Sequence, residues 1–318
     1  MDNQDIAGRL QSTLSEHGFK SSIVSASHAS ELRETIAEHM ESGVIDRRGY
    51  RGYVAFFEKM LSQQVPWAQS IVAIAVPRPV LEVIFAADGQ KRSTLIPPTY
   101  EHSVDATVKT IIEGVLAPHG YRFVRAELPK KLLAARSGLA RYGKNNIAYV
   151  KGMGSYLRLL TFYTDLPTVA DRWQDPQVLD ECAGCAACIN KCPAGAIDPD
   201  RFYLRTTRCL TYHNESPDPF PSWIDESWHH CLVGCMKCQH FCPANKDVRS
   251  WRRHLAEFTE EETALLLKGL PACDLPPTLV AKFDDLGLLE EPVVLARNLK
   301  SVLTAKGRLV AGGVSTGE

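Results

Sequence analysis

The chain has 318 residues, 45% of them hydrophobic and 23% charged, so it can bury a full core and form one large or two modest domains. Its formal net charge of −1 excludes a global attraction to nucleic acid or to a membrane surface. The first twenty residues lack the basic flank and apolar core of a secretory signal, and we therefore expect a cytoplasmic protein.

The pattern over residues 1–170 predicts an α+β domain built around a sheet. An amphipathic helix opens the chain, a second helix is expected in GYVAFFEKMLSQ, and SIVAIAV and VLEVIFAADGQKRSTLI read as strands, the latter with a hairpin turn at its Asp-Gly pair. The interrupted stretch from Ser70 has prolines and charges that exclude a spanning helix. A helix from Ser103 to Leu116, a helix in LLAARSGLA and strands near NIAYV and YLRLLTFYT complete the domain.

Two further segments follow the first domain. Residues 171–250 hold most of the cysteines and little apolar periodicity, so we expect inorganic clusters to stabilise this part of the chain. Residues 251–318 predict a short helical extension: WRRHLAEFTEEETALLLKG reads as a helix with a capping box at Thr259 and Glu262, and the final AGGVSTGE is expected to be disordered.

Nine of the ten cysteines lie between Cys182 and Cys242, which favours metal ligation over disulfides in a reducing compartment. ECAGCAACINKCPAGAID carries the Cys-x2-Cys-x2-Cys-x3-Cys-Pro spacing of bacterial ferredoxins, in which three thiolates hold one 4Fe-4S cluster and the fourth binds another. CMKCQHFCP supplies the second motif. The prediction is therefore a ferredoxin-like double-cluster domain.

We assign each cluster four cysteines. The first cysteine group comprises Cys182, Cys185, Cys188 and Cys242, and the second cysteine group comprises Cys192, Cys209, Cys235 and Cys238. Cys231 competes with Cys209 as the eighth ligand, and Cys273 is expected to be an ordinary thiol. A radical S-adenosylmethionine enzyme, read from Cys231, and a zinc site of two Cys-x2-Cys pairs are the alternatives for the same cysteines.

The segments SGLARYGKNNIAYVKGMGSYLRLLTFYTDLP, RCLTYHNE and GCMKCQHFCPAN, together with the ferredoxin motif, resemble the epoxyqueuosine reductase family and, more distantly, corrinoid reductive dehalogenases. The resemblance implies a nitroreductase-like cobalamin-binding domain ahead of the two clusters. It also implies that the cobalamin-binding residues lie in two glycine-containing segments. These residues are Gly143, Lys144, Asn145, Asn146, Gly154 and Ser155, with Arg141 beside them.

The chain departs from the tRNA-modifying members of this family in two places. Their Arg-Asp-Tyr-His stretch, which carries the expected proton donor, corresponds here to IPPTYEHSVD, and about 70 residues follow the last cluster ligand in place of helical repeats. Tyr100 and His102 are the predicted catalytic proton donors, and Glu101 and Asp105 are further candidates. Both departures argue against a nucleic-acid substrate.

We therefore predict an iron–sulfur, cobalamin-dependent reductase. Co(I) would drive the two-electron removal of an oxygen or a halogen from a small organic substrate, with electrons from a low-potential donor of the ferredoxin or flavodoxin type. Two alternatives stay open. The protein could re-reduce the corrinoid of a partner without a substrate of its own, or it could reduce epoxyqueuosine in tRNA.

Overall fold

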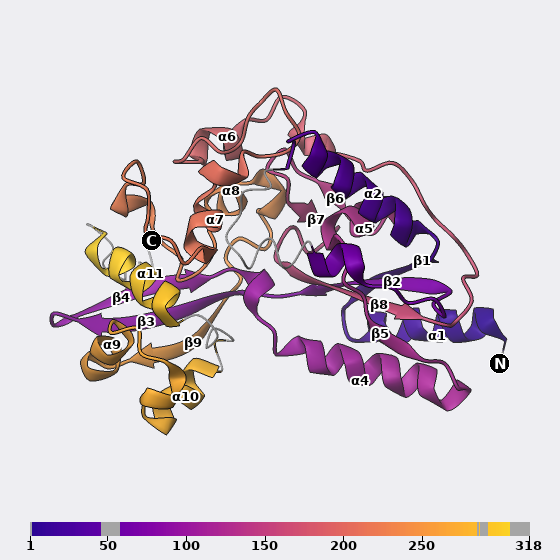
Figure 1. The fold of residues 1–318 in the computed structure, drawn as a ribbon, viewed down its shortest axis with the longest axis horizontal. Helices are drawn as coiled ribbons and strands as arrows, with labels where there is room; N and C mark the ends of the chain where they lie inside the picture. The colour runs from indigo at the N-terminus through magenta and orange to yellow at the C-terminus, as the bar shows by residue number, and fades with distance from the viewer. Residues whose placement is uncertain (1, 46–57, 285, 287–291, 306–318) are drawn as a thin grey trace, which may run out of the picture. The chain divides into compact units, whose positions relative to one another are not determined.

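The computed structural model describes residues 2–45, 58–284, 286 and 292–305, which divide between two compact units (Figure 1). Unit 1 comprises residues 1–78, 102–209 and 237–250, and unit 2 comprises residues 79–101, 210–236 and 251–318. Both units are assembled from separated segments: the chain passes from unit 1 to unit 2 after residue 250, and residue 170 lies within unit 1. The division into three consecutive domains remains a prediction. Among the described residues, no helix has the length and apolar character needed to cross a bilayer.

Unit 1 is built on a four-stranded antiparallel sheet in the order β1-β2-β8-β5. Its strands are β1 (Lys20–Ser25), β2 (Ser70–Pro77), β8 (Leu157–Thr164) and β5 (Phe123–Arg125). β2 and β8 pair along their whole length, from Ser70 opposite Thr164 to Pro77 opposite Leu157. The predicted strand SIVAIAV is confirmed as β2.

Helices cover both faces of this sheet (Figure 1). On one face, α1 (Asn3–Glu16) and α4 (Val104–Leu116) pack against Val72, Ile74 and Val76 of β2. On the other face, α2 (His28–Glu41) and α5 (Lys130–Arg136) pack against Ile71 and Ala73. Because successive side chains of a strand point to opposite faces, a continuous apolar strand such as β2 fits between two helical layers.

Three short helices and a small hairpin lie along the cysteine segments, and all but the last helix belong to unit 1. The hairpin pairs β6 (Arg141–Tyr142) with β7 (Ala148–Tyr149). The helices α6 (Ala187–Lys191) and α8 (Lys237–His240) pack together and lie within the first and second cysteine motifs respectively. The third, α7 (Leu210–Glu215), begins directly after Cys209 and belongs to unit 2.

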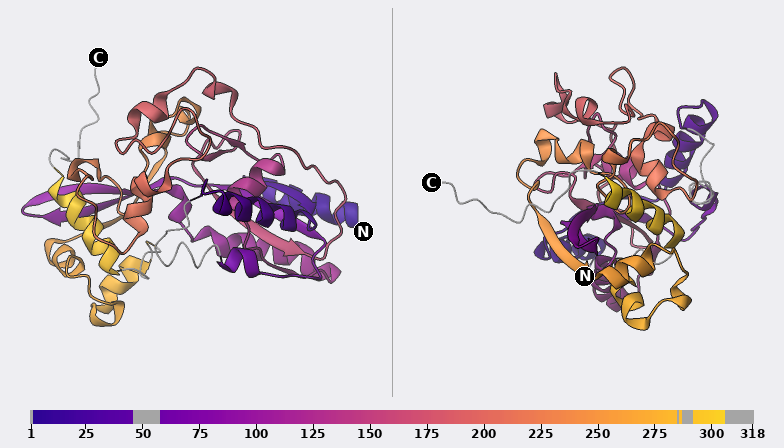
Figure 2. Two further views of the ribbon diagram at one scale, coloured as in Figure 1. Left: turned by 45° about the horizontal axis from the view of Figure 1, so that its top comes forward. Right: turned by 90° about the vertical axis from the view of Figure 1, so that its left-hand side faces the viewer.

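Unit 2 contains a three-stranded sheet in the order β4-β3-β9 (Figure 1, Figure 2). β3 (Val80–Ala87) and β4 (Gln90–Ile96) form the predicted hairpin, whose turn residues Asp88 and Gly89 both have positive φ. Helices α9 (Glu260–Leu266), α10 (Pro277–Asp284) and α11 (Pro292–Thr304) complete an apolar core with the sheet. The hairpin prediction is confirmed, since the Asp-Gly pair supplies the conformation that a two-residue turn requires.

One predicted element of unit 2 is wrong. Residues expected to begin a helix at Trp251 instead form β9 (Arg252–Phe258), which pairs in parallel with β3. The helix starts only at Glu260, where Thr259 and Glu262 form the predicted capping box. Residues 252–258 form backbone hydrogen bonds with the open edge of β3, and a helix over the same residues would leave that edge unpaired. Pairing with β3 therefore outweighs the helix preference of the local sequence. The first half of the predicted helix in GYVAFFEKMLSQ, residues 52–57, lies outside the described residues, and residues 58–62 are helical as predicted. The predicted disordered tail lies wholly outside the described residues.

Candidate iron–sulfur site

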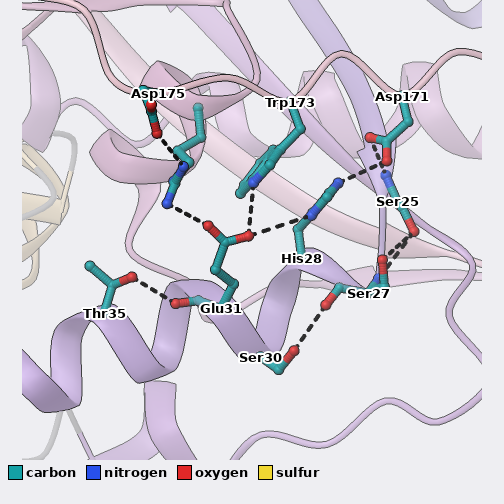
Figure 3. Close-up of polar contacts among 10 residues, drawn as sticks. Ser25, Ser27, His28, Ser30, Glu31, Thr35, Asp171, Trp173 and Asp175 are labelled. Carbon is teal, nitrogen blue, oxygen red and sulfur yellow. Dashed lines mark hydrogen bonds and ion pairs between the residues drawn. The ribbon is translucent and has the colours of Figure 1, made fainter.

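The chain reaches the first cysteine motif through residues 165–179, which contain neither helix nor strand. A polar network in unit 1 fixes this segment to α2 and α5 (Figure 3). The rings of His28 and Trp173 stack 4.0 Å apart, His28 Nε2 lies 2.8 Å from Asp171, and Trp173 donates to Glu31 at 2.9 Å. Arg136 pairs with Glu31 and with Asp175. The approach to Cys182 is therefore held by side chains together with backbone hydrogen bonds, which join Gln174 to Arg136 at 2.9 Å and both Gln177 and Leu179 to Tyr142 at 2.8 Å.

Tight turns shape the first motif around its cysteines. The backbone N–H of Cys185 donates to the carbonyl of Cys182 at 3.2 Å, and Gly184 between them has a φ of 68° that favours glycine. α6 then places Cys188 in its first turn, and Cys192 ends the helix. The first three cysteines of this compact loop line one cavity.

The first cysteine group comes together around one cavity of unit 1. The cavity is lined by the four cysteines and by residues of the β6–β7 turn and the Cys-Pro segment, namely Cys182, Cys185, Cys188, Cys242, Gly143, Lys144, Asn145, Tyr149, Leu179, Glu181, Ala187, Pro243 and Ala244. Three cysteines of one motif thus share a cavity with the last cysteine of the other. Four thiols in a largely apolar lining are the donor set that a 4Fe-4S cluster requires.

The surroundings of these thiols favour a cluster of several irons. Burial raises the pKa of Cys182 and Cys188, while the backbone N–H of Lys144 hydrogen-bonds to Cys182 and lowers its pKa in part. Cationic iron would supply the charge that favours the thiolates. Among the described residues, no three His, Cys, Asp or Glu side chains converge closely enough to hold a single metal ion, and the thiols surround a cavity instead.

The second cysteine group is divided between the units. Cys192, Cys209 and Cys238 belong to unit 1, and Cys235 belongs to unit 2. Lys131 as a whole residue is exposed, but its ammonium group is desolvated, which lowers the pKa of Lys131. The thiolates of Cys209 and Cys238 act in the opposite direction and raise the pKa of this ammonium. One ammonium therefore interacts with both thiols, which brings two of the predicted ligands into one neighbourhood.

Cys231, the competing ligand, lies in the core of unit 2. Cys231 is 0% exposed and forms a β-bridge with Leu95. Beside this bridge, the N–H of Leu232 donates a hydrogen bond to the carbonyl of Leu95 at 2.8 Å. Nearby, His230 Nε2 accepts a hydrogen bond from Met236 at 3.1 Å and lies 3.9 Å from Cys235 Sγ. The choice of Cys209 over Cys231 remains a prediction. Cys273 is exposed.

The residues predicted to bind cobalamin contact the cysteine segments. Lys144 Nζ donates to the carbonyl of Cys185 at 3.2 Å, and Asn145 Nδ2 donates to that of Cys238 at 3.4 Å. The Ser155 backbone N–H donates to Asn245 Oδ1 at 2.8 Å. Gly154 has a φ of 56°, and a Cβ there would lie 2.2 Å from the same Asn245 oxygen.

The remaining members of the predicted cobalamin set lie at the rim of the turn. Asn146, with a φ of 57°, accepts from Lys131 Nζ at 2.9 Å through its carbonyl. Arg141 pairs with Asp180 at 2.7 Å, and both side chains are largely exposed. Contact of these residues with a corrinoid remains a prediction. Asn245 was not predicted from the sequence, although a polar residue two positions after the Cys-Pro pair was the available signal.

The predicted proton donors belong to different units. In unit 2, the Tyr100 hydroxyl donates to Glu215, and buried Glu101 lies 4.0 Å from Arg253. In unit 1, His102 Nδ1 lies 3.3 Å from the Arg158 guanidinium. Burial first, and then the charge of Arg158, lowers the pKa of His102. Because arginine can only donate, His102 Nδ1 is the acceptor and the neutral ring carries its proton on Nε2.

His102 belongs to a group of charged and polar side chains that we call the Asp105 cluster. Its members are His102, Asp105, Arg125, Lys130 and Arg158, and this cluster was not predicted from the sequence. Arg158, 5% exposed, donates to both oxygens of Asp105 at 2.6 and 2.7 Å, and Arg125 donates at 3.0 Å. Burial, followed by Arg125 and Arg158, lowers the pKa of Lys130 to about 8. An arginine within the apolar run YLRLLTF was the signal for this cluster.

A wider pocket lies elsewhere in unit 1, between the end of α2 and the segment that leads to Cys209. It has a volume of about 510 Å³, within the range of small-molecule sites. Arg201 donates to the Val44 carbonyl at 3.2 Å, and Arg205 pairs with Asp198 at 2.6 Å. The lining residues include Met40, Gly43, Val44, Ile45, Arg201, Leu204, Arg205, Thr206, Thr207 and Arg208.

Comparison with known proteins identifies both the cysteine segments and the fold. Residues 181–245 match the 4Fe-4S double cluster binding domain. An epoxyqueuosine reductase of Leadbetterella byssophila is 27% identical over 207 residues, which cover 62% of this chain and 66% of that protein. The enzyme of Pseudomonas aeruginosa is 34% identical over 101 residues, covering 31% and 27%. The matches thus span less than two thirds of these relatives.

Solved structures of the same enzymes share the fold. The epoxyqueuosine reductase of Streptococcus thermophilus superposes with a TM-score of 0.66 at 18% identity, covering 94% of this chain and 81% of that one. An epoxyqueuosine reductase with a tRNA-Tyr epoxyqueuosine-modified stem loop gives a TM-score of 0.66 at 20% identity, with 96% and 82% covered. The predicted family resemblance is confirmed, and so is the double-cluster domain.

Proposed function

We propose that this relative of the epoxyqueuosine reductases is an iron–sulfur oxidoreductase that conducts electrons through two 4Fe-4S clusters to a site of two-electron reduction. The first cysteine group carries the proposal, since Cys242 of the second motif lines the same cavity as three cysteines of the first. Exchange of one ligand between motifs is the arrangement of two-cluster ferredoxins. A low-potential donor of the ferredoxin or flavodoxin type would supply the electrons.

The chain's own residues hold and tune these sites. Clusters bound there would supply transfer of one electron at a time. Cys182, Cys185, Cys188 and Cys242 would ligate the first, and the Lys144 backbone N–H would stabilise negative charge on the Cys182 sulfur. Cys192, Cys209, Cys235 and Cys238 would ligate the second. The N–H of Ala196, 3.3 Å from Cys192 Sγ, would act there in the same way.

The reaction class we favour is reductive removal of an oxygen or halogen from a small organic substrate. Two electrons and one proton convert the carbon–heteroatom bond to a carbon–hydrogen bond and release the heteroatom as an anion, so the site needs a proton donor. His102, with its proton on Nε2 and its Nδ1 facing Arg158, is suited to that role in unit 1. Tyr100 is the alternative in unit 2.

A corrinoid as the electron acceptor is a finer part of the proposal. In this arrangement Lys144, Asn145 and Ser155 hydrogen-bond to Cys185, Cys238, Asn245 and Gln239, so the side chains of Asn145 and Ser155 would have to exchange partners to contact a corrinoid. The pocket beside Arg201 and Arg205 is the roomier place for a large ligand in unit 1. Because these hydrogen bonds serve the cysteine segments in this arrangement, we derive no step through cobalt.

Reduction of epoxyqueuosine in tRNA is the second candidate function. Relatives that carry this name align with the chain, and a tRNA stem-loop complex of such an enzyme shares its fold. The stretch IPPTYEHSVD does not contain the Arg-Asp-Tyr-His sequence expected in those enzymes, and its one aspartate, Asp105, pairs with Arg158. The two candidates therefore differ in substrate and share the electron path.

The test is an anaerobic experiment in two stages. The protein is reconstituted with iron and sulfide, incubated with hydroxocobalamin and desalted, and cobalt per chain is measured. Retention of about one cobalt supports the corrinoid reductase. Full iron without cobalt contradicts it and favours an electron carrier that serves a partner protein. Turnover of epoxyqueuosine-containing tRNA by the reduced protein, with no turnover of small epoxides or aryl halides, would replace the small-molecule proposal with the tRNA one.

A further inference from the structure

A buried tyrosine of unit 1 reaches the first cysteine group. Tyr149, at the end of β7, is 3% exposed and lines the cavity that the four cysteines share. Tyr149 and Cys242 line this cavity together, and Cys242, after burial, raises the pKa of the Tyr149 hydroxyl. The first cysteine group thus receives a side-chain contact in addition to the backbone N–H groups of its own loops.

Asn145 orients the Tyr149 hydroxyl. Asn145 is 1% exposed, and its Nδ2 lies 2.8 Å from the Tyr149 hydroxyl. Two further contacts fix the amide orientation: Oδ1 accepts from the Ile147 N–H at 3.3 Å, and Nδ2 also faces the Cys238 carbonyl at 3.4 Å. Because Asn145 donates to the tyrosine oxygen, the hydroxyl's own proton is available for Cys242.

The β6–β7 turn holds both side chains tightly. The N–H of Gly143 donates to the Ile147 carbonyl at 2.9 Å, which closes the turn. A Cβ at Gly143 would lie 2.5 Å from Asn145 Oδ1 and 2.7 Å from Tyr149 Cε2. Glycine at this position lets the amide and the ring pack against the backbone, so the relay from Asn145 through Tyr149 to Cys242 has little freedom to reorient.

We propose that Tyr149, oriented by Asn145, donates a hydrogen bond to Cys242 and raises the reduction potential of the cluster held by the first cysteine group. Reduction adds negative charge to a cluster and its sulfur ligands, and a donor aimed at a ligand sulfur stabilises that charge. The inference rests on the proposed cluster ligation. It does not depend on the corrinoid or on the substrate.

The test replaces the donor and then strengthens it. Tyr149→Phe removes the hydroxyl, and site-specific 3-fluorotyrosine at position 149 keeps it as a more acidic donor. Reduced clusters are followed by electron paramagnetic resonance during an anaerobic redox titration. We expect Tyr149→Phe to decrease the reduced-to-oxidised ratio of one cluster about tenfold at fixed potential, the order of one hydrogen bond to a charged group. For a one-electron couple this corresponds to a midpoint lowered by about 59 mV. Fluorotyrosine should raise the midpoint of the same cluster.

Tyr142→Phe is the matched control. Tyr142 is a buried tyrosine of the same hairpin, and its ring packs edge-on against Phe202. Its substitution should leave both midpoints unchanged. An unchanged midpoint in the fluorotyrosine protein at full iron content overturns the proposal, even if Tyr149→Phe fails to retain iron. An equal shift in Tyr142→Phe also overturns it. Wild-type protein that holds no iron would instead contradict the proposed ligation itself.

Discussion

Replacing Asp105 with alanine should destabilise unit 1 strongly at neutral pH. The carboxylate accepts two hydrogen bonds from Arg158, whose side chain is 7% exposed, and one from Arg125, whose side chain is 39% exposed. The bond to Arg125 faces solvent and contributes at most about 1 kcal/mol. Loss of the partner of buried Arg158 leaves an uncompensated charge, which costs about 3 kcal/mol. We therefore expect Asp105→Ala to lower the free energy of unfolding by about 3 kcal/mol.

Urea denaturation of the cluster-free protein at pH 7, followed by tryptophan fluorescence, measures this loss. Asp175→Ala is the control, since Asp175 pairs with Arg136 but its side chain is 90% exposed, and it should cost below about 1 kcal/mol. Equal effects of the two substitutions would refute the buried-pair reasoning.

The same ion pair predicts a pH dependence with a definite sign. Burial alone would raise the pKa of Asp105, but the hydrogen bonds and charges of Arg158 and Arg125 outweigh it and lower the pKa below its ordinary value. A carboxyl group with a lowered pKa in the folded state stabilises the fold above its unfolded pKa. The difference in free energy of unfolding between wild type and Asp105→Ala should therefore have its maximum value at pH 7 and decrease as the pH falls below about 4. A difference that grows on acidification would contradict this sign.

Three further outcomes are expected. Cys242→Ser should reduce iron from about eight to about four per chain, whereas Cys273→Ser, at an exposed thiol, should retain all of it; iron analysis distinguishes them. Lys130, whose pKa is lowered to about 8, disfavours folding while it is charged, so Lys130→Met should raise the melting temperature at pH 7. The gain should shrink above about pH 8 and disappear only above about pH 11, where the wild-type ammonium is deprotonated in the unfolded state as well. Gly154→Ala would bring a Cβ within 2.2 Å of Asn245 Oδ1 and should lower the melting temperature, whereas Gly114→Ala, in α4 with no atom within 4 Å, should raise or preserve it.

The predictable features were those encoded in local patterns. The spacing of Cys182, Cys185 and Cys188 and the Cys-Pro ending at Cys242 indicate clusters because loop ligands must follow one another at short intervals. The Asp88-Gly89 turn and the Thr259 cap are likewise local, and the structure has both. These features depend on few residues that are close in sequence.

Features that depend on tertiary pairing were not predictable from one sequence. β9 forms because β3 offers an open edge, and nothing in RRHLAEF announces that partner. The turn at Gly143–Asn146 reads equally well as a ligand loop, and only its contacts with Cys185 and Cys238 show that it supports the cysteine segments. The Asp105 cluster joins α4, β5, α5 and β8, which lie far apart in the chain.

The most direct test of the central claim is the cluster content of anaerobically reconstituted wild-type protein. Iron and acid-labile sulfide are measured per chain, and the reduced sample is quantified by electron paramagnetic resonance. Two clusters predict about eight iron and eight sulfide per chain, with two paramagnetic centres on full reduction. Tightly bound zinc without sulfide, or only about four iron per chain, would contradict the two-cluster account.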